Sequence, residues 1–161
     1  MLTYRRLEAE DLNTICTFPR DEEELYCVSP KFSYPLTPEQ IMKVLEGRFN
    51  PTVIVAEDRR QPLAYANLYD KDEEQHTCWL GNVVVRPGYR GSGVASFLLE
   101  SMMQQASNEH DIQTLKLYCH NINTRALLFY CKHGFTPCGS KVMTYFNRGK
   151  IVGIEMFKKL D

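Results

Sequence analysis

The chain has 161 residues, of which 43% are hydrophobic and 24% charged, and its formal net charge is −1. These values predict one soluble globular domain, residues 1–161, with a single sizeable core. The near-zero charge excludes a whole-chain field that would attract nucleic acid or an anionic membrane. No apolar run approaches the roughly 20 residues of a membrane span, and the N-terminus lacks the apolar stretch of a signal peptide. We therefore expect a cytoplasmic protein, monomeric or homodimeric, that binds neither nucleic acid nor membranes.

Six cysteines are spread along the chain with no C-x-x-C pair among them. This spacing argues against a zinc knuckle and against a disulfide framework. We expect mostly buried, free thiols in a reducing compartment, and no metal site. The six are Cys16, Cys27, Cys78, Cys119, Cys131 and Cys138. Cys119 and Cys131 lie near the site proposed below, so a role for either stays open.

The first half of the chain alternates between short strands and short helices. Thr37 can cap one of these helices, because Pro38 suits a first helical turn and Gln40 can complete a capping box. The expected elements, in order, are a strand (2–7), three helices (10–18, 21–28 and 37–45), two strands (52–56 and 63–69) and a charged, solvated loop (70–74).

The second half begins with a strand–helix repeat and ends with a hairpin. Its expected elements are a strand (77–85), a helix (93–107), a strand (112–119), a helix (123–133), and two strands (141–146 and 151–157) around a turn (147–149). Gly134 ends the last helix. Antiparallel-looking strands followed by β-α-β-α and a hairpin predict a mixed α/β, or α+β, fold with one central sheet.

Arg90-Gly91-Ser92-Gly93 lies between the strand over residues 77–85 and the helix that follows. A helix N-terminus presents unpaired N–H groups and a positive dipole end, and glycines let a ligand approach the backbone closely. This arrangement predicts an anion site, to which Arg90 adds a cation with bidentate reach. No lysine follows Gly93 as a P-loop requires, and Ser96 stands where a dinucleotide fingerprint needs its third glycine. A glycine turn that only connects the two elements is the alternative.

Two short motifs follow one another in this half of the chain. The first, at residues 90–95, fits the pattern R/Q-x-x-G-x-G/A, and the Val-Val-Val-Arg-Pro run before it fits a strand leading into that pattern. The second, at residues 123–135, fits N-x-x-A-x-x-x-Y-x-x-x-G-F. Together they resemble the signature of the GNAT (GCN5-related) N-acetyltransferases. The resemblance is strong from about residue 63 to residue 135, and before residue 60 it rests on element order alone.

The resemblance implies a central mixed, mostly antiparallel sheet of about six or seven strands, splayed between the fourth and fifth, with helices on both faces. It also implies acetyl-CoA as cosubstrate, without a metal. The CoA pyrophosphate would bind the N–H groups of the glycine loop, and the pantetheine arm would pair with the fourth strand. A bulge near Asn82 and Val83 would be a suitable cause of the splay. The implied cofactor-binding residues are Val83, Val84, Val85, Arg90, Gly91, Ser92, Gly93, Val94, Ala95, Ser96 and Asn123.

The implied reaction is direct attack of a primary amine on the thioester. A backbone N–H near Val83 or Val84 could stabilise the oxyanion. Tyr130, with an intrinsic pKa near 10, is the candidate catalytic residue, a general acid for the departing thiolate, because it stands at the tyrosine of the second motif. The alternative for Tyr130 is a core aromatic, since apolar residues surround it in the sequence.

The general base is where this chain departs from a common pattern of the family. Many members carry a glutamate at the positions that are Trp79 and Tyr118 here. Other candidates lie nearby, and none is selected: Glu73, Glu74, His76 and His120. Catalysis without a dedicated base also stays open.

The acceptor is expected to be a primary amine on a small molecule or a peptide. The acidic residues 21–24 could attract a cationic acceptor, although a solvated helix start explains them as well. The missing glutamates favour a second function, a non-catalytic acyl-CoA-binding module, whereas the retained Tyr130 favours an enzyme. A nucleotide-phosphate binder would leave the motif at residues 123–135 unexplained.

Overall fold

The computed structural model of the chain describes residues 1–146 and 148–161. Its strands are β1 (Leu2–Arg6), β2 (Arg48–Ala56), β3 (Ala64–Asp72), β4 (Thr77–Val85), β5 (Thr114–His120), β6 (Thr136–Thr144) and β7 (Lys150–Lys159). Its helices are the 3-10 turn η1 (Ala9–Asp11), α1 (Leu12–Ile15), α2 (Glu22–Val28), α3 (Pro38–Leu45), α4 (Val94–His110) and α5 (Thr124–Lys132).

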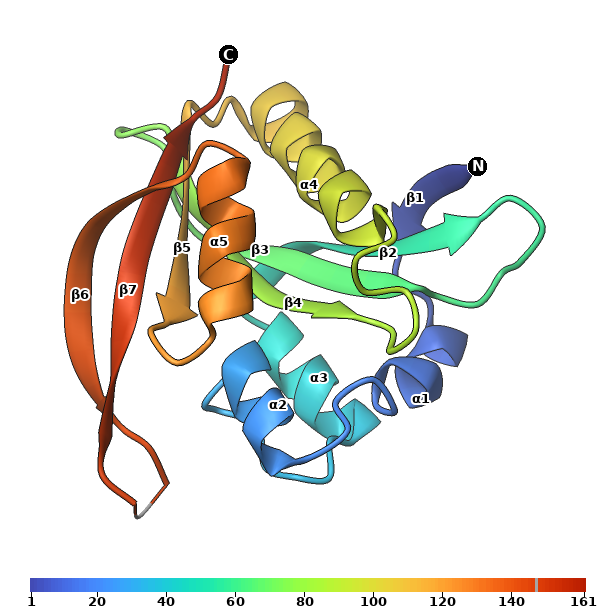
Figure 1. Cartoon of the computed structure of the whole chain (residues 1–161). Coiled ribbons are helices and arrows are strands. Elements are labelled where there is room, and N and C mark those ends of the chain that lie inside the picture. Colours follow the sequence, from blue (N-terminus) through green and yellow to red (C-terminus); the bar gives the residue numbers. More distant parts are fainter. Residues whose placement is uncertain (147) are drawn as a thin grey trace.

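The strands form one seven-stranded sheet in the order β1-β2-β3-β4-β5-β7-β6. Every neighbouring pair is antiparallel except β4 and β5, which are parallel. Figure 1 shows α4 and α5 on one side of the sheet and α1, α2 and α3 on the other. The expected mixed α+β fold, with a mostly antiparallel sheet and helices on both faces, is confirmed.

The sheet separates two apolar cores. The larger core packs α4 and α5 against β3, β4 and β5 through residues such as Leu98, Met102 and Leu115. The smaller core packs α1, α2 and α3 against β2 and β3 through residues such as Ile15, Leu25 and Ile41. Burial of these side chains supplies the main driving force for folding and fixes each helix to its own face.

Four expected boundaries were wrong. The helix expected over 10–18 is a 3-10 turn followed by one α-helical turn, and β2 begins four residues early, at Arg48. Strand β3 runs to Asp72, through residues expected to be loop, and β6 begins at Thr136 instead of 141. Most residues of β6 are exposed on both faces, although the strand pairs with β7. Its sequence therefore lacks the alternation of apolar and polar residues by which a strand is predicted. Of the expected turn 147–149, Asn147 lies outside the described residues.

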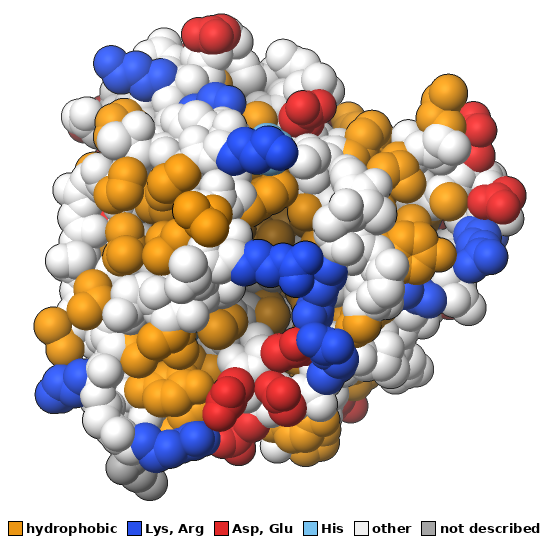
Figure 2. All heavy atoms as spheres, in the orientation of Figure 1, with side chains coloured by type: hydrophobic (Ala, Val, Ile, Leu, Met, Phe, Trp, Pro, Cys, Tyr) orange, Lys and Arg blue, Asp and Glu red, His pale blue; other side chains and the backbone are white. Residues whose placement is uncertain are grey.

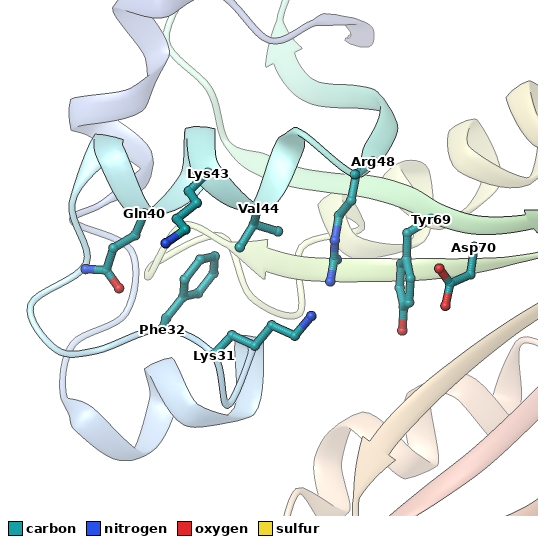
Figure 3. Close-up of a pocket in the computed structure, with 9 residues that line it drawn as sticks. Lys31, Phe32, Gln40, Lys43, Val44, Arg48, Tyr69 and Asp70 are labelled. Carbon is teal, nitrogen blue, oxygen red and sulfur yellow. The ribbon is translucent and has the colours of Figure 1, made fainter.

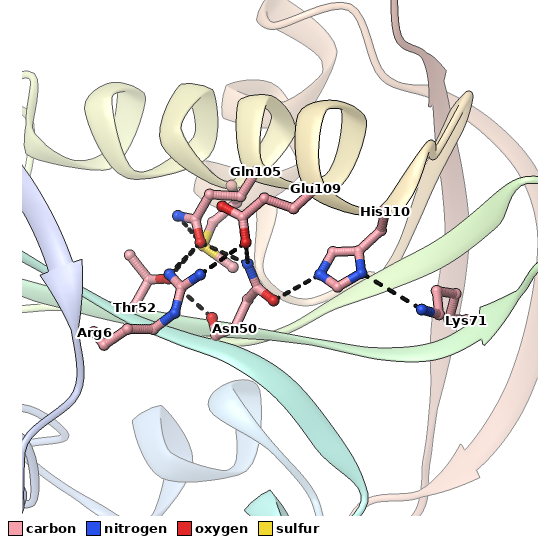
Figure 4. Close-up of polar contacts among 8 residues, drawn as sticks. Arg6, Asn50, Thr52, Lys71, Gln105, Glu109 and His110 are labelled. Atoms are coloured by element: carbon pink, nitrogen blue, oxygen red, sulfur yellow. Dashed lines mark hydrogen bonds and ion pairs between the residues drawn. The ribbon is translucent and has the colours of Figure 1, made fainter.

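A polar cluster fixes the C-terminal half of α4 to the sheet (Figure 4). Asn50 Nδ2 donates to Gln105 Oε1 over 2.8 Å and to Glu109 Oε1 over 3.1 Å. Arg6 pairs with Glu109 over 3.0 Å, and His110 Nε2 donates to Asn50 Oδ1 over 2.8 Å. This cluster holds the end of α4 that lies far from the glycine loop against β1 and β2.

Candidate active site

Strands β4 and β5 pair along only one end. Thr77, Cys78 and Trp79 face Thr114, Leu115 and Lys116 in register. Beyond these three pairs no backbone pairing joins the two strands in the described residues. This divergence of the two strands is the expected splay, and it leaves the edge of β4 that faces β5, Leu80–Val85, without a partner strand. Backbone groups on this edge can pair with an extended ligand arm, although the Val85 carbonyl already accepts from Arg90 Nε over 3.4 Å.

A bulge in β4 lies directly beside the splay. Tyr65 of β3 faces Val84, but Asn67 faces Gly81, so β4 has one residue more than β3 in this interval. Asn82 takes a left-handed backbone conformation with φ 54°. As a consequence Leu80 packs in the larger core and Val84 in the smaller one, although strict alternation would place both on one face. The expected bulge at Asn82 and Val83 is thereby present.

A buried polar network, which sequence reasoning missed, holds this bulge. Asn67 is fully buried, and its Nδ2 donates to Asn82 Oδ1 over 2.9 Å and to the Tyr65 hydroxyl over 3.0 Å. Its Oδ1 accepts from Arg48 Nη1 over 3.0 Å. A buried amide with partners on both atoms fixes their geometry, because each lost bond would leave an unsatisfied group. The only signal in the sequence was one asparagine inside the otherwise apolar run of β3.

The glycine loop presents the N-terminus of α4 to solvent. Gly91 and Gly93 have φ of 79° and 92°, and Gly93 is the N-cap residue. A Cβ added to Gly93 would meet nothing within 4 Å, so the space beside the first turn is open. The N–H groups of this turn lack partners within the helix, and the 17-residue helix adds its dipole. The loop therefore has the open backbone geometry of an anion site, and its expected contact with the CoA pyrophosphate stays a prediction.

Arg90 does not extend freely into this space. Its Nη1 lies 3.0 Å from Glu24 Oε2 of α2, and its Nη2 lies 3.4 Å from Glu24 Oε1. Burial opposes ionisation of Glu24, but hydrogen bonds from Arg20 and Arg90 outweigh it and lower its pKa to about 2. A second cation beside the loop is Arg125 of α5, whose Nη2 would lie 3.7 Å from a Cβ on Gly91.

The other expected cofactor residues lie on β4, on α4 and at the start of α5. Val83 is half-buried against the larger core, which contains Val85, whereas Val84 belongs to the smaller core. Asn123 caps α5, because its Oδ1 accepts from the Ala126 N–H over 3.4 Å. Among the remaining loop residues, Val94 is buried, Ala95 is half-buried, Ser92 is exposed, and Ser96 Oγ lies 3.0 Å from His133 Nε2. The expected residues thus lie on β4, the glycine loop, α4 and the start of α5, although Val84 faces the smaller core, and their contact with a cofactor stays a prediction.

Tyr130 lies on α5 against the larger core. Its ring packs edge-on against Phe129 and Phe135, and 8% of the residue is exposed. Burial, and next the Cys119 thiol, raises the pKa of Tyr130 well above its usual range. The phenol is therefore protonated at neutral pH, and no partner for its hydroxyl is found among the described residues.

Aromatic side chains fill the two positions where carboxylates were sought. The rings of Trp79 and Tyr118 stack at 4.8 Å with an interplanar angle of 16°, and Lys141 Nζ lies 4.1 Å from the Tyr118 centroid. His76 lies at the opposite end of β4 beside Asp111. Neither His76 nor the exposed Glu73 and Glu74 of the β3–β4 turn belongs to the splay.

His120 ends β5 on the face opposite Cys119. Its ring lies 5.2 Å from that of Tyr26, and its Nδ1 is the one buried side-chain nitrogen or oxygen without a partner in residues 1–146 and 148–161. Burial, and next Lys141, lowers the pKa of His120. The imidazole is therefore neutral at pH 7 and able to accept a proton.

The acidic run of α2 is neutralised within the protein. Asp21 caps α2 by accepting from the Glu24 N–H over 2.8 Å. Glu22 and Glu23 pair with Arg148 over 3.5 and 3.4 Å. Figure 2 accordingly shows acidic side chains over α2 directly beside lysine and arginine side chains. The helix-start explanation of this run is the one that the contacts support.

Metal clusters, disulfides and helices fit to span a membrane are all absent from the residues that the structure describes. No group of three or more His, Cys, Asp and Glu side chains is placed to hold a metal ion, and all six cysteines are unpaired. None of the helices in residues 1–146 and 148–161 combines the length and the apolar character that a membrane crossing requires.

Comparisons with known proteins agree with this geometry. The pattern of the Acetyltransferase (GNAT) family matches residues 15–135. The spore coat polysaccharide biosynthesis protein SpsD of Bacillus subtilis is 27% identical over 135 residues, which cover 80% of this chain and 45% of that protein. The chain thus spans about half the length of this curated relative.

Solved structures with the same fold were also found. A protein assigned as a phosphinothricin N-acetyltransferase has a TM-score of 0.81 at 22% identity, covering 100% of this chain and 99% of its own. The spermidine N-acetyltransferase of Vibrio cholerae in complex with CoA and spermine has a TM-score of 0.78 at 17% identity, with coverages of 99% and 95%. An N-acetyltransferase from Staphylococcus aureus Mu50 has a TM-score of 0.77 at 19% identity, with coverages of 100% and 99%.

Proposed function

The chain belongs to the GNAT acetyltransferase family, and from this premise we propose that it transfers the acetyl group of acetyl-CoA to a primary amine. The observation that carries the proposal is the splayed β4–β5 pair with the open N-terminus of α4 beside it. A sheet opened on one side of a parallel pair offers an edge for an extended arm, and the glycine loop offers N–H groups for a diphosphate. Acetyl-CoA has both parts.

The residues that would hold acetyl-CoA come from three elements. The backbone of Val83 and the N–H of Val85 would serve along the open edge of β4, and residues 91–96 would supply the loop and the first turn of α4. Arg125 adds a cation beside Gly91, while Arg90 supports the loop through Glu24. Asn123 orients α5 from the other side of the opening by capping its first turn.

The proposed chemistry uses opposite faces of the sheet. Leu117 and Cys119 of β5 face the core that contains Tyr130, so the alternate residue His120 faces the side of α2. An amine that approaches from the His120 side would pass its proton to the neutral imidazole, directly or through water, as it attacks the carbonyl carbon. The C–S bond then breaks, and the thiolate leaves toward Tyr130, which donates its proton. A backbone N–H at the bulge is available for the oxyanion.

The second candidate is a non-catalytic acyl-CoA-binding module. The observation that favours it is the aromatic stack of Trp79 and Tyr118 at the positions where carboxylates were sought. Such a module would bind acetyl-CoA and would acetylate no amine above the uncatalysed rate.

One experiment tests both candidates. Acetyl-CoA binding is measured by calorimetry with the wild type and Gly93→Val, and a panel of primary amines is assayed for acetylation. We expect binding that ATP does not displace, a large loss of affinity in the variant, and turnover of at least one amine. A folded Gly93→Val variant with wild-type affinity would refute the loop assignment. Binding without any turnover would select the non-catalytic module.

A further inference from the structure

A cleft of about 530 Å³ lies under α3, on the face of the sheet opposite Tyr130. It is lined by Lys31, Phe32, Gln40, Lys43, Val44, Gly47, Arg48, Tyr69 and Asp70. Figure 3 shows Lys31 and Arg48 directed toward one another across this cleft, with the Tyr69 ring beside the guanidinium. The volume lies in the range of sites for small molecules and is too small for a folded partner.

The cleft has an excess of positive charge. Three cations line it, Lys31, Lys43 and Arg48, against the one carboxylate of Asp70. In residues 1–146 and 148–161 none of the three cations forms an ion pair within 4.0 Å. This contrasts with α2, where every glutamate of the first turn has an arginine partner.

Arg48 connects the cleft with the reaction centre. Its guanidinium lies 4.1 Å from the Tyr69 ring centroid and donates to Asn67, which in turn binds Asn82 at the bulge of β4. An added Cβ on Gly81 would overlap Arg48 Nη1, so the side chain crosses directly over the strand at the splay. A ligand bound to Arg48 would therefore lie close to Gly81 of β4.

We infer that the acceptor is a small primary amine that also carries an anionic group, a carboxylate or a phosphate, bound by Lys31, Lys43 and Arg48. This inference rests on the proposed function and narrows its substrate class. A fixed guanidinium flanked by two flexible ammonium groups suits an anionic oxygen cluster. The same three charges repel a polyamine. The glutamates of α2 cannot offset this repulsion, because they are already paired with arginines. The amine end of such an acceptor would then lie toward the bulge and His120.

Matched pairs of acceptors test the inference. Glucosamine 6-phosphate is compared with glucosamine, alanine with alaninamide, and spermidine serves as the polycation. We expect kcat/KM to be at least about 10-fold higher for the anionic member of one pair, the gain of one charge-assisted contact. The pair that shows the preference identifies the anion as phosphate or carboxylate. The preference should weaken with rising ionic strength, because the two lysines are exposed.

Variants place the preference at the cleft. Lys31→Gln combined with Lys43→Gln removes two exposed charges and should bring the ratio of kcat/KM within the preferred pair toward 1. Lys159→Gln, an equally exposed lysine at the end of β7, should leave the ratio unchanged. An equal loss for both members of the pair in the double variant would contradict the inference.

The two proposals fail in distinguishable ways. If the protein binds acetyl-CoA but acetylates spermidine or the neutral amines in preference, the anionic acceptor is overturned. The proposed acetyltransferase activity would still stand. If no amine is acetylated, calorimetry of the same compounds with the CoA complex decides. Binding of an anionic member that the double variant weakens supports the cleft, and absence of such binding overturns it. Failure to bind acetyl-CoA at all would overturn the proposed function itself.

Discussion

Gly81→Ala should disrupt the contact between the cleft and the splay. An ideal Cβ at this position would overlap Arg48 Nη1 and would lie 2.8 Å from Tyr69 Cε1, closer than real Cβ contacts allow. Because Gly81 sits in the middle of β4, the backbone cannot move aside without breaking its register with β3. The Arg48 guanidinium must therefore shift, and it then loses its bond to Asn67 and its place over Tyr69.

The expected loss of stability follows from those two contacts. A hydrogen bond to a charged group contributes about 1.5–3 kcal/mol, and a cation–π contact about 0.5–1 kcal/mol or more. Relaxation of the flexible Arg48 recovers part of this sum, so we expect a loss of about 2–3 kcal/mol. For a chain of this length that corresponds to a fall in Tm of roughly 4–12 °C.

Urea or thermal unfolding measures the loss, and two controls give it meaning. Gly47 lines the same cleft, but a Cβ added there would meet nothing within 4 Å. The stability of the Gly47→Ala variant should therefore stay near that of the wild type or rise slightly. Arg48→Ala removes the group that Gly81→Ala displaces. The double variant should therefore be clearly less destabilised than the sum of the two single variants. Strict additivity, or a Gly81→Ala variant as stable as Gly47→Ala, would refute the close approach of Arg48 to β4.

Further outcomes are expected for three variants and for the pH profile of the wild type. Tyr130→Phe should lower kcat at least about tenfold with acetyl-CoA affinity unchanged by calorimetry, and an unaltered kcat would return Tyr130 to a packing role. Because burial raises the Tyr130 pKa, the wild-type rate should not decline through its ionisation below about pH 10. His120→Phe should lower kcat at neutral pH and remove the acid limb of the rate profile, whereas an unchanged profile would exclude proton transfer to His120. Burial lowers the pKa of His110, and the charges of Lys71 and Arg6 lower it further, whereas Glu109 opposes them. As the pH falls, the unfolded chain therefore takes up a proton at this histidine at a higher pH than the folded protein does. The unfolding free energy should therefore fall as pH drops below about 6.5, and by less in His110→Gln; equal falls would contradict this.

The parts of the site that were predictable are local in the sequence. Strand β4 was expected at its observed bounds, because nine residues of apolar and β-branched character stand between two turns. The glycine loop follows from residue types within 90–95, and α5 follows from residue types within 123–135. Even the bulge at Asn82 could be expected, since the implied splay requires one there.

The parts that were not predictable depend on partners far apart in the chain. Arg90 was expected to face a phosphate, but Glu24, 66 residues away, holds it instead. Arg48 was expected in no element, and it meets Asn67 only because β2 extends four residues further than its apolar core. Its role in the cleft depends on α3 covering β2 and β3, which no short window of sequence describes. Pairwise contacts of this kind are set by the tertiary packing alone.

The ion pair between Arg90 and Glu24 joins the donor side of the molecule to the acceptor side. The loop that carries Arg90 precedes α4, whereas Glu24 belongs to α2, which also contributes Tyr26 beside His120. A diphosphate that drew the guanidinium away would release Glu24 to Arg20 alone and loosen α2 over the acceptor face. By thermodynamic linkage, an acceptor that required α2 to move would in turn change the affinity for acetyl-CoA by the same factor. The two substrates would then bind interdependently and not as independent ligands.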